Sequence, residues 1–185
     1  MVQINFLFSL LAATGITAVN AIPVDTKPGL EGIPVGAKDG LYIGHIKDDG
    51  KTNWEFLGAH NQSIPVTARD DRPLAARAAI PYATCAGFGV NADQVNVAQG
   101  YLANLCGNGY YFSGRSIAQV YGGGVAYACN YASSQTCHSG DVWDFFGDIN
   151  HKCGFAHGGQ AGAGWESVPA WKAAYGRTST GTGFC

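Results

Sequence analysis

The chain has 185 residues, with 11 basic against 13 acidic side chains, a formal net charge of −2 and 13% charged residues. This balance argues against a nucleic-acid-binding protein, because such a protein needs a basic surface for the phosphate backbone. The longest apolar run is shorter than the roughly 20 residues of a membrane-spanning helix. We therefore expect no transmembrane segment.

Residues 1–21 have the pattern of a secretory signal peptide. An apolar run from Phe6 to Ala13 is followed by small residues up to Ala21, which suit a cleavage site. The run is too short to cross a bilayer, and no charged stop follows it. We expect a secreted, extracellular mature protein.

Residues 22–77 hold no cysteine, most of the prolines and most of the charged side chains. Within them, 41–46 and 53–57 flank Asp49-Gly50, a pattern typical of a β-hairpin. A charged stretch without periodicity ends at Arg77, where a processing protease could cut. We interpret 22–77 as a propeptide or loose extension with a possible hairpin, and 78–185 as the folded cysteine-rich domain. Asn61 opens an N-glycosylation acceptor, which predicts a glycoprotein.

Two amphipathic helices are predicted in residues 78–185. The first starts near Asn91, a good N-cap residue, and its apolar positions follow the helical period. The second is capped by Ser139 and is closed by Lys152 and Gly154. The apolar positions of this second helix form one continuous stripe along its length. Asp141 lies in its first turn, where the helix dipole favours negative charge. The apolar positions are Val95, Ala98, Leu102 and Leu105 in the first helix and Val142, Phe145, Phe146, Ile149 and Cys153 in the second.

Short apolar and aromatic runs between glycines predict four to five strands. The sequence therefore predicts an α+β fold, a small two-layer sandwich with two helices on a mostly antiparallel sheet. The expected strands are 82–90, 117–121 running into 125–131, 164–168 and a final strand at 180–184.

All six cysteines lie after residue 84, and an even number in a secreted chain predicts three disulfides among 15 possible pairings. Cys129 with Cys137, across a turn, is the first pair that we expect. Cys185 would pin the C-terminal end. An alternative zinc site from Cys153, His157, Cys137 and His138 lacks the paired spacing that zinc sites show, so we expect neither metal nor cofactor. The cysteines are Cys85, Cys106, Cys129, Cys137, Cys153 and Cys185.

Two sets of side chains are candidates for function. His138, His151 and His157, with Asp148 or Glu166, could support acid–base hydrolysis, for instance of RNA. Exposed aromatic rings could instead stack on a sugar or anchor a protein, although burial is the commoner fate of large rings. The possible binding residues are Trp143, Trp165, Trp171 and Tyr175.

Several features together resemble the fungal secreted effector family of killer-toxin-like, necrosis-inducing cysteine-rich proteins. They are an amphipathic helix, the strand 126–131 with Cys129, a second helix that opens with Gly140-Asp141, and a glycine-rich strand, over roughly residues 91–168. The resemblance implies an α/β sandwich, secretion by a fungus, a role in virulence, and action on a host or competitor cell. It implies no catalytic residues.

Three functions therefore remain open. The preferred one is a disulfide-stabilised effector or toxin-like protein that binds a cell-surface protein or glycan without catalysis. The second is a small secreted hydrolase of the ribonuclease type. The third is a cell-wall carbohydrate-binding protein that uses exposed tryptophans.

Overall fold

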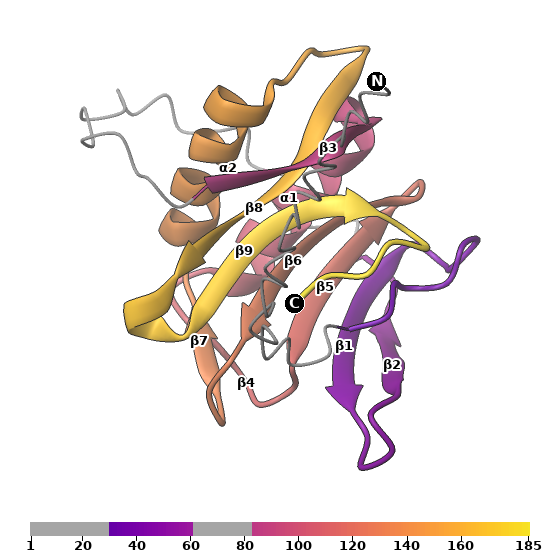
Figure 1. The fold of residues 1–185 in the computed structure, drawn as a ribbon, viewed down its shortest axis with the longest axis vertical. Helices are drawn as coiled ribbons and strands as arrows, with labels where there is room; N and C mark the ends of the chain where they lie inside the picture. The colour runs from indigo at the N-terminus through magenta and orange to yellow at the C-terminus, as the bar shows by residue number, and fades with distance from the viewer. Residues whose placement is uncertain (1–29, 61–82) are drawn as a thin grey trace, which may run out of the picture.

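Seven strands form the main sheet, in the order β2-β1-β5-β6-β9-β8-β3, and each neighbouring pair is antiparallel (Figure 1). The structure is a computed structural model that describes residues 30–60 and 83–185. A separate small ribbon pairs β4 with β7. The strands are β1 (Gly40–Ile46), β2 (Thr52–Gly58), β3 (Ala83–Asn91), β4 (Tyr110–Phe112), β5 (Ser116–Tyr121), β6 (Gly124–Asn130), β7 (Gln135–Cys137), β8 (Gln160–Val168) and β9 (Ala173–Ser179).

Both helices, α1 (Ala92–Cys106) and α2 (Ser139–Cys153), pack on the sheet, α1 against β5 and β6 and α2 against β8, β3 and β9. The Asn91 side chain accepts a hydrogen bond from the Gln94 amide at 3.0 Å, which confirms the predicted cap. The second predicted cap is wrong by one residue, because His138 is the N-cap of α2 and makes no side-chain capping bond. Gly154 ends α2 with φ at 84°, a conformation that glycine adopts at little cost.

The helix side of the sheet holds the larger core cluster. Alternation along β6 points Ala126 and Ala128 toward the helices, where they meet Phe146 of α2 and Leu102 of α1, all at most 1% exposed. The predicted fold class, an α+β sandwich with two helices on an antiparallel sheet, is confirmed.

The opposite side of the sheet is covered by two chain segments instead of helices. Ile33 and Phe184 lie on residues of β5 and β6, among them Val120 and Tyr127, in a second core cluster. The predicted final strand 180–184 is wrong, because the last strand is β9 and the chain then reverses at Gly181, whose φ is 82°. Leu30 and Phe184 form a β-bridge, so the two covering segments also contact each other.

Three disulfides link these layers, as the cysteine count predicts, but the pair expected first is wrong. Alternation along β6 sends Cys129 to the side that faces the C-terminal segment, whereas Cys137 on β7 reaches Cys106 at the end of α1. The two cysteines therefore lie in different clusters despite their short separation. The pairs are Cys85–Cys153, Cys106–Cys137 and Cys129–Cys185.

The predicted hairpin is present, and it extends the main sheet. β1 pairs with β2 and also with β5, from Gly40–Val120 to Gly44–Ser116. Leu30 and Ile33, just before the hairpin, are 2% and 0% exposed. Residues 30–60 thus complete a sheet that begins in the cysteine-rich part. Removal of residues 22–77 remains a prediction, and Arg77 lies outside the described residues.

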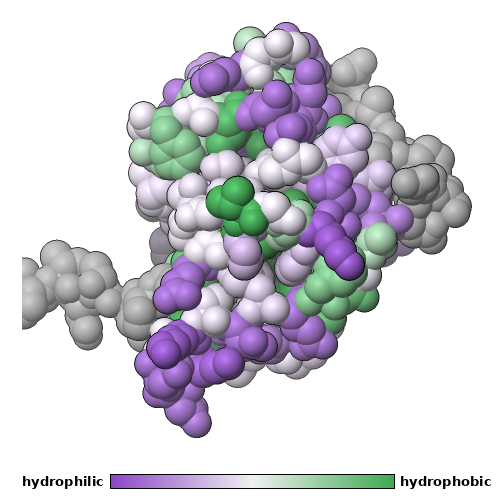
Figure 2. All heavy atoms as spheres, turned by 90° about the vertical axis from the view of Figure 1, so that its right-hand side faces the viewer, coloured by the Kyte–Doolittle hydropathy of each residue, from purple (hydrophilic) through white to green (hydrophobic). Residues whose placement is uncertain are grey.

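The open edge of the sheet beyond β2 carries a mixed surface. Figure 2 looks onto this side and shows polar residues gathered at the turn of the hairpin, with apolar residues in separate small groups. The turn contains Lys47, Asp48, Asp49 and Lys51. Charged residues near an edge strand disfavour pairing with another chain, and the turn supplies them at one end of β2, whereas Phe56 and Leu57 within β2 are exposed.

His60 holds the end of residues 30–60 against α1. Its ring stacks on Tyr101 with centroids 3.7 Å apart, and its Nε2 donates to the Val120 carbonyl at 2.7 Å. Burial lowers the pKa of His60 below its ordinary value, an effect that outweighs the Val120 hydrogen bond and the nearby Asp39 charge.

We expect acid to weaken this contact. Because the folded pKa of His60 is below the unfolded value of 6.5, the unfolded chain takes up the proton more readily. The stabilisation that neutral His60 contributes is fully present above pH 6.5, the unfolded pKa. It is lost as the pH falls below 6.5 toward the lower folded pKa. The urea midpoint should therefore drop between pH 7.5 and pH 5, and less so in His60→Gln than in the exposed-histidine control His151→Gln. Equal pH dependence in both variants would contradict this role.

Arg177 on β9 is a buried cation that closes the C-terminal end of α2. Its guanidinium donates to the carbonyls of Gly162 and Gly154, both at 2.8–2.9 Å, and to the Asn150 side chain, while the residue is 1% exposed. Burial lowers the pKa of Arg177 to about 10, so the group stays charged at neutral pH. A cation near these carbonyls also complements the helix dipole.

Replacing Arg177 with methionine should lower the free energy of unfolding by about 3 kcal/mol, because buried acceptors lose their donors. Arg115→Met is the matched control, since Arg115 is only partly buried, and we expect a loss of about 1 kcal/mol there. Urea unfolding followed by circular dichroism measures both. Similar losses in the two variants would show that Arg177 has no special structural role.

Candidate functional site

A groove of about 560 Å³ opens on the side of the sheet away from the helices. Trp165, Tyr127 and Ala174, from β8, β6 and β9, form its floor. Phe88 of β3 lies on one side, and the segment from Thr182 to Cys185, with Leu30 and Glu31, lies on the other. Its volume is in the range of small-molecule sites, about 300–1,000 Å³.

Aromatic rings pack closely at the boundary between the floor and the C-terminal segment. Tyr127 and Phe184 stack with centroids 4.2 Å apart, and the Trp54 and Phe184 centroids are 5.3 Å apart. The Tyr127 ring lies over Gly176, where a Cβ would come within 2.4 Å of the tyrosine oxygen. Glycine at 176 is therefore required for the ring to lie on the sheet.

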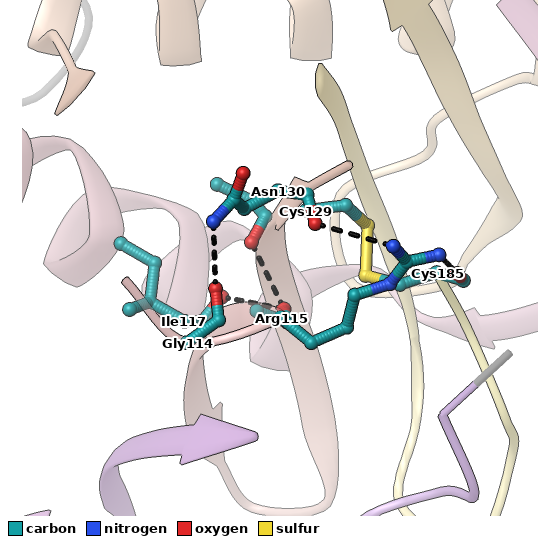
Figure 3. Close-up of a disulfide and its surroundings, with 8 residues drawn as sticks. Gly114, Arg115, Ile117, Cys129, Asn130 and Cys185 are labelled. Atoms are coloured by element: carbon teal, nitrogen blue, oxygen red, sulfur yellow. Dashed lines mark hydrogen bonds between the residues drawn. A yellow bond between two sulfur atoms is a disulfide. The ribbon is translucent and has the colours of Figure 1, made fainter. Parts of the chain in front are cut away.

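The Cys129–Cys185 disulfide forms one end of the groove and fixes the C-terminal segment (Figure 3). The Arg115 guanidinium donates to the Cys185 carbonyl at 2.9 Å and lies over the Tyr131 ring, 4.3 Å from its centroid. Asn130 holds the loop before β5 through a 3.1 Å bond from its side-chain amide to the Gly114 carbonyl. This end of the groove is thus held by a covalent bond and by side-chain hydrogen bonds.

The β3 side of the groove is a bulge. Pairing between β3 and β8 shifts between Cys85 and Gly89, so residues 86–88 leave the ladder, and Gly87 has φ at 82°. Ala86 is exposed and Phe88 is 39% exposed, both on the rim of the groove. Bulges of this kind often re-aim side chains next to functional sites.

Thr178 is the unusual polar residue in this lining. It is 4% exposed, it lines the groove, and its Oγ1 is buried with no hydrogen-bond partner among the described residues. Buried hydroxyl groups in folded proteins are nearly always hydrogen-bonded. A bound molecule that reaches this oxygen would supply the missing bond.

The four aromatic residues predicted as possible binding residues do not form one site. Trp165 lies in the groove floor, and Trp143 is partly buried against the helix-side core. Tyr175 is 3% exposed and stacks on Phe145, so it belongs to the core. Trp171 is 49% exposed and lies near His138 in a separate hollow.

The histidines of the hydrolase hypothesis are also separated. His138 and His151 lie at the two ends of α2, about 20 Å apart at 1.5 Å per residue. The His138 Nδ1 is 3.0 Å from the Asn108 carbonyl, and the His157 Nδ1 is 3.9 Å from the Asp93 carboxylate. Glu166 is 1% exposed on β8. A shared site for all three histidines is therefore not assembled.

The alternative zinc site is contradicted by the disulfides, because Cys137 and Cys153 are each bonded to another cysteine. Within residues 30–60 and 83–185, no three histidine, cysteine or acidic side chains are grouped as metal ligands. In the same residues, no helix is both long and apolar enough to cross a membrane. Asn61, the predicted glycosylation site, lies outside the described residues.

Sequence reasoning missed most of the groove. Tyr127, Tyr131 and Phe88 were expected only as strand residues, and Thr178 was not expected to matter. The one local signal was Gly176 between two bulky residues of β9, which indicates a ring packed on the strand.

The chain matches no family model, no curated protein and no solved structure.

Proposed function

We propose that this protein is a secreted effector or toxin-like protein, of the kind that its sequence pattern resembles, and that it acts on a host or competitor cell by binding without catalysis. The groove beside the Cys129–Cys185 disulfide is its binding site. The observation that carries this proposal is an aromatic-lined groove whose end is fixed by a disulfide and by Arg115. A preformed site of this kind binds with little ordering cost.

The length of α2 separates His138 from His151, which keeps these two histidines from acting together on one substrate and favours binding over hydrolysis there. The three disulfides support action outside the cell, since such bonds persist in oxidising compartments. Trp165 is the predicted binding residue that the groove contains.

The test is a variant that fills the groove from its exposed rim. Ala86→Trp should reduce cell death or growth inhibition at least fivefold when purified protein is applied to plant tissue or yeast. Ala170→Trp, at an exposed position on the short helix before β9, is the control and should leave the effect unchanged. Equal activity of both variants, with unchanged melting temperatures, would refute the groove as the site of action.

A further inference from the structure

The chemistry of the groove indicates what kind of molecule it accepts. Most of its lining is aromatic or aliphatic, and Trp165, Tyr127 and Phe184 are its largest rings beside Phe88 and Tyr131. A predominantly apolar lining with few polar groups is typical of sites for small organic molecules. A sugar ring needs a partner for each of several hydroxyls, whereas most of this lining is apolar.

Charge is nearly absent from the floor. Arg177 lines the groove, but its guanidinium is bonded to Gly162, Gly154 and Asn150 on the helix side. Glu31 is exposed at the rim, and its backbone is held by Thr52 and Trp54. An ionised ligand group would therefore be desolvated over the floor without an opposite charge, which is costly.

One buried polar group of the lining, the Thr178 hydroxyl, bears on the polarity of the ligand. Thr178 Oγ1 can both donate and accept one hydrogen bond, and it has no partner in the described residues. The neighbouring Thr182 hydroxyl is 3.3 Å from the Ser179 hydroxyl and is thus already engaged. One hydroxyl on an otherwise apolar molecule would satisfy Thr178.

We propose that the groove binds an uncharged lipid alcohol, a hydrocarbon body that carries one hydroxyl group. The hydrocarbon covers the rings of the floor, and the hydroxyl bonds to Thr178. This proposal rests on the groove being the binding site of the proposed function, and it names the class of ligand.

Competition against the neutral fluorescent probe N-phenyl-1-naphthylamine tests the proposal. The probe should bind wild-type protein, and decan-1-ol should displace it at a concentration several-fold lower than 1-chlorodecane or decanoate, which lack the neutral hydroxyl. Cholesterol is tested in parallel as a second competitor. Whether cholesterol or decan-1-ol displaces the probe at the lower concentration distinguishes a sterol from a chain alcohol as the ligand. No probe binding, or stronger displacement by decanoate, overturns the proposal.

Thr178→Val separates this role from a structural one. The variant should keep probe binding and lose the preference for decan-1-ol over 1-chlorodecane, so that the ratio of the two displacing concentrations falls to about one. Its melting temperature without ligand should be unchanged or higher, because an unsatisfied hydroxyl is replaced by a methyl group of similar shape. Thr136→Val, at an exposed position on β7, should retain the preference. A preserved preference in Thr178→Val, or a large loss of its stability, overturns the proposal.

Failure of this inference is distinguishable from failure of the proposed function. If neither probe nor alcohol binds, but Ala86→Trp still abolishes the effect on cells, the groove takes a different ligand, such as a glycan or a protein segment. If alcohols bind but Ala86→Trp leaves the effect on cells intact, binding at the groove is not what acts on the cell.

Discussion

Reduction of the three disulfides is expected to unfold this protein at neutral pH without denaturant. The bonds join residues 68, 31 and 56 positions apart. By chain entropy, each loop closure of this length stabilises the fold by about 4 kcal/mol. Even if the contributions overlap, their total is comparable to the whole stability of a typical domain, about 5–15 kcal/mol.

Far-UV circular dichroism with and without dithiothreitol measures this effect. The double variant Cys129→Ala/Cys185→Ala should lose about 2–5 kcal/mol and should loosen the groove, since the C-terminal segment loses its covalent link. Cys85→Ala/Cys153→Ala is the comparison, with a similar loss but an intact groove end. A reduced protein with an unchanged spectrum and urea midpoint would show that packing alone sustains the fold.

Deletion of residues 22–60 is expected to lower the melting temperature by more than about 10 °C or to make the protein insoluble. Leu30, Ile33 and Tyr42 are at most 7% exposed, and burial of each such side chain contributes about 1.5–3 kcal/mol. The deletion also leaves β5, with Ile117, Ala118 and Val120 fully buried at present, as an open apolar edge.

Differential scanning calorimetry of the shortened chain tests this expectation, with the synthetic peptide 30–60 added back as the control. No disulfide joins residues 30–60 to the rest, so a separate peptide can take their place. Because β1 pairs with β5, the peptide should bind there and restore the melting temperature. An unchanged melting temperature without the peptide would instead support the interpretation of residues 22–77 as a dispensable propeptide.

Local pattern was sufficient for the regular elements. The stripe Val142, Phe145, Phe146 and Ile149 faces the core in α2, and Asn91 caps α1 as expected. Strand patterns located β3, β5, β6 and β8 within a few residues. These predictions succeeded because the helical and strand periods are set by which face of one element meets the core.

Predictions that depend on two distant segments were less successful. The Cys129–Cys137 pairing assumed that neighbours in sequence meet, whereas the pleat of β6 turns Cys129 away from β7. The stretch 180–184 has strand-like composition, yet it reverses at Gly181 and covers the sheet.

The amino-acid sequence by itself determined the α+β class, the two helices, the hairpin and the presence of three cystines, because each follows from local periodicity or from an even number of cysteines. Only the tertiary structure decided which cysteines pair, that residues 30–60 extend the sheet, and that Thr178, Trp165 and Tyr127 share one groove. These features arise where strands far apart in sequence lie side by side, and a side chain's neighbours across a sheet depend on strand order, which no local pattern encodes.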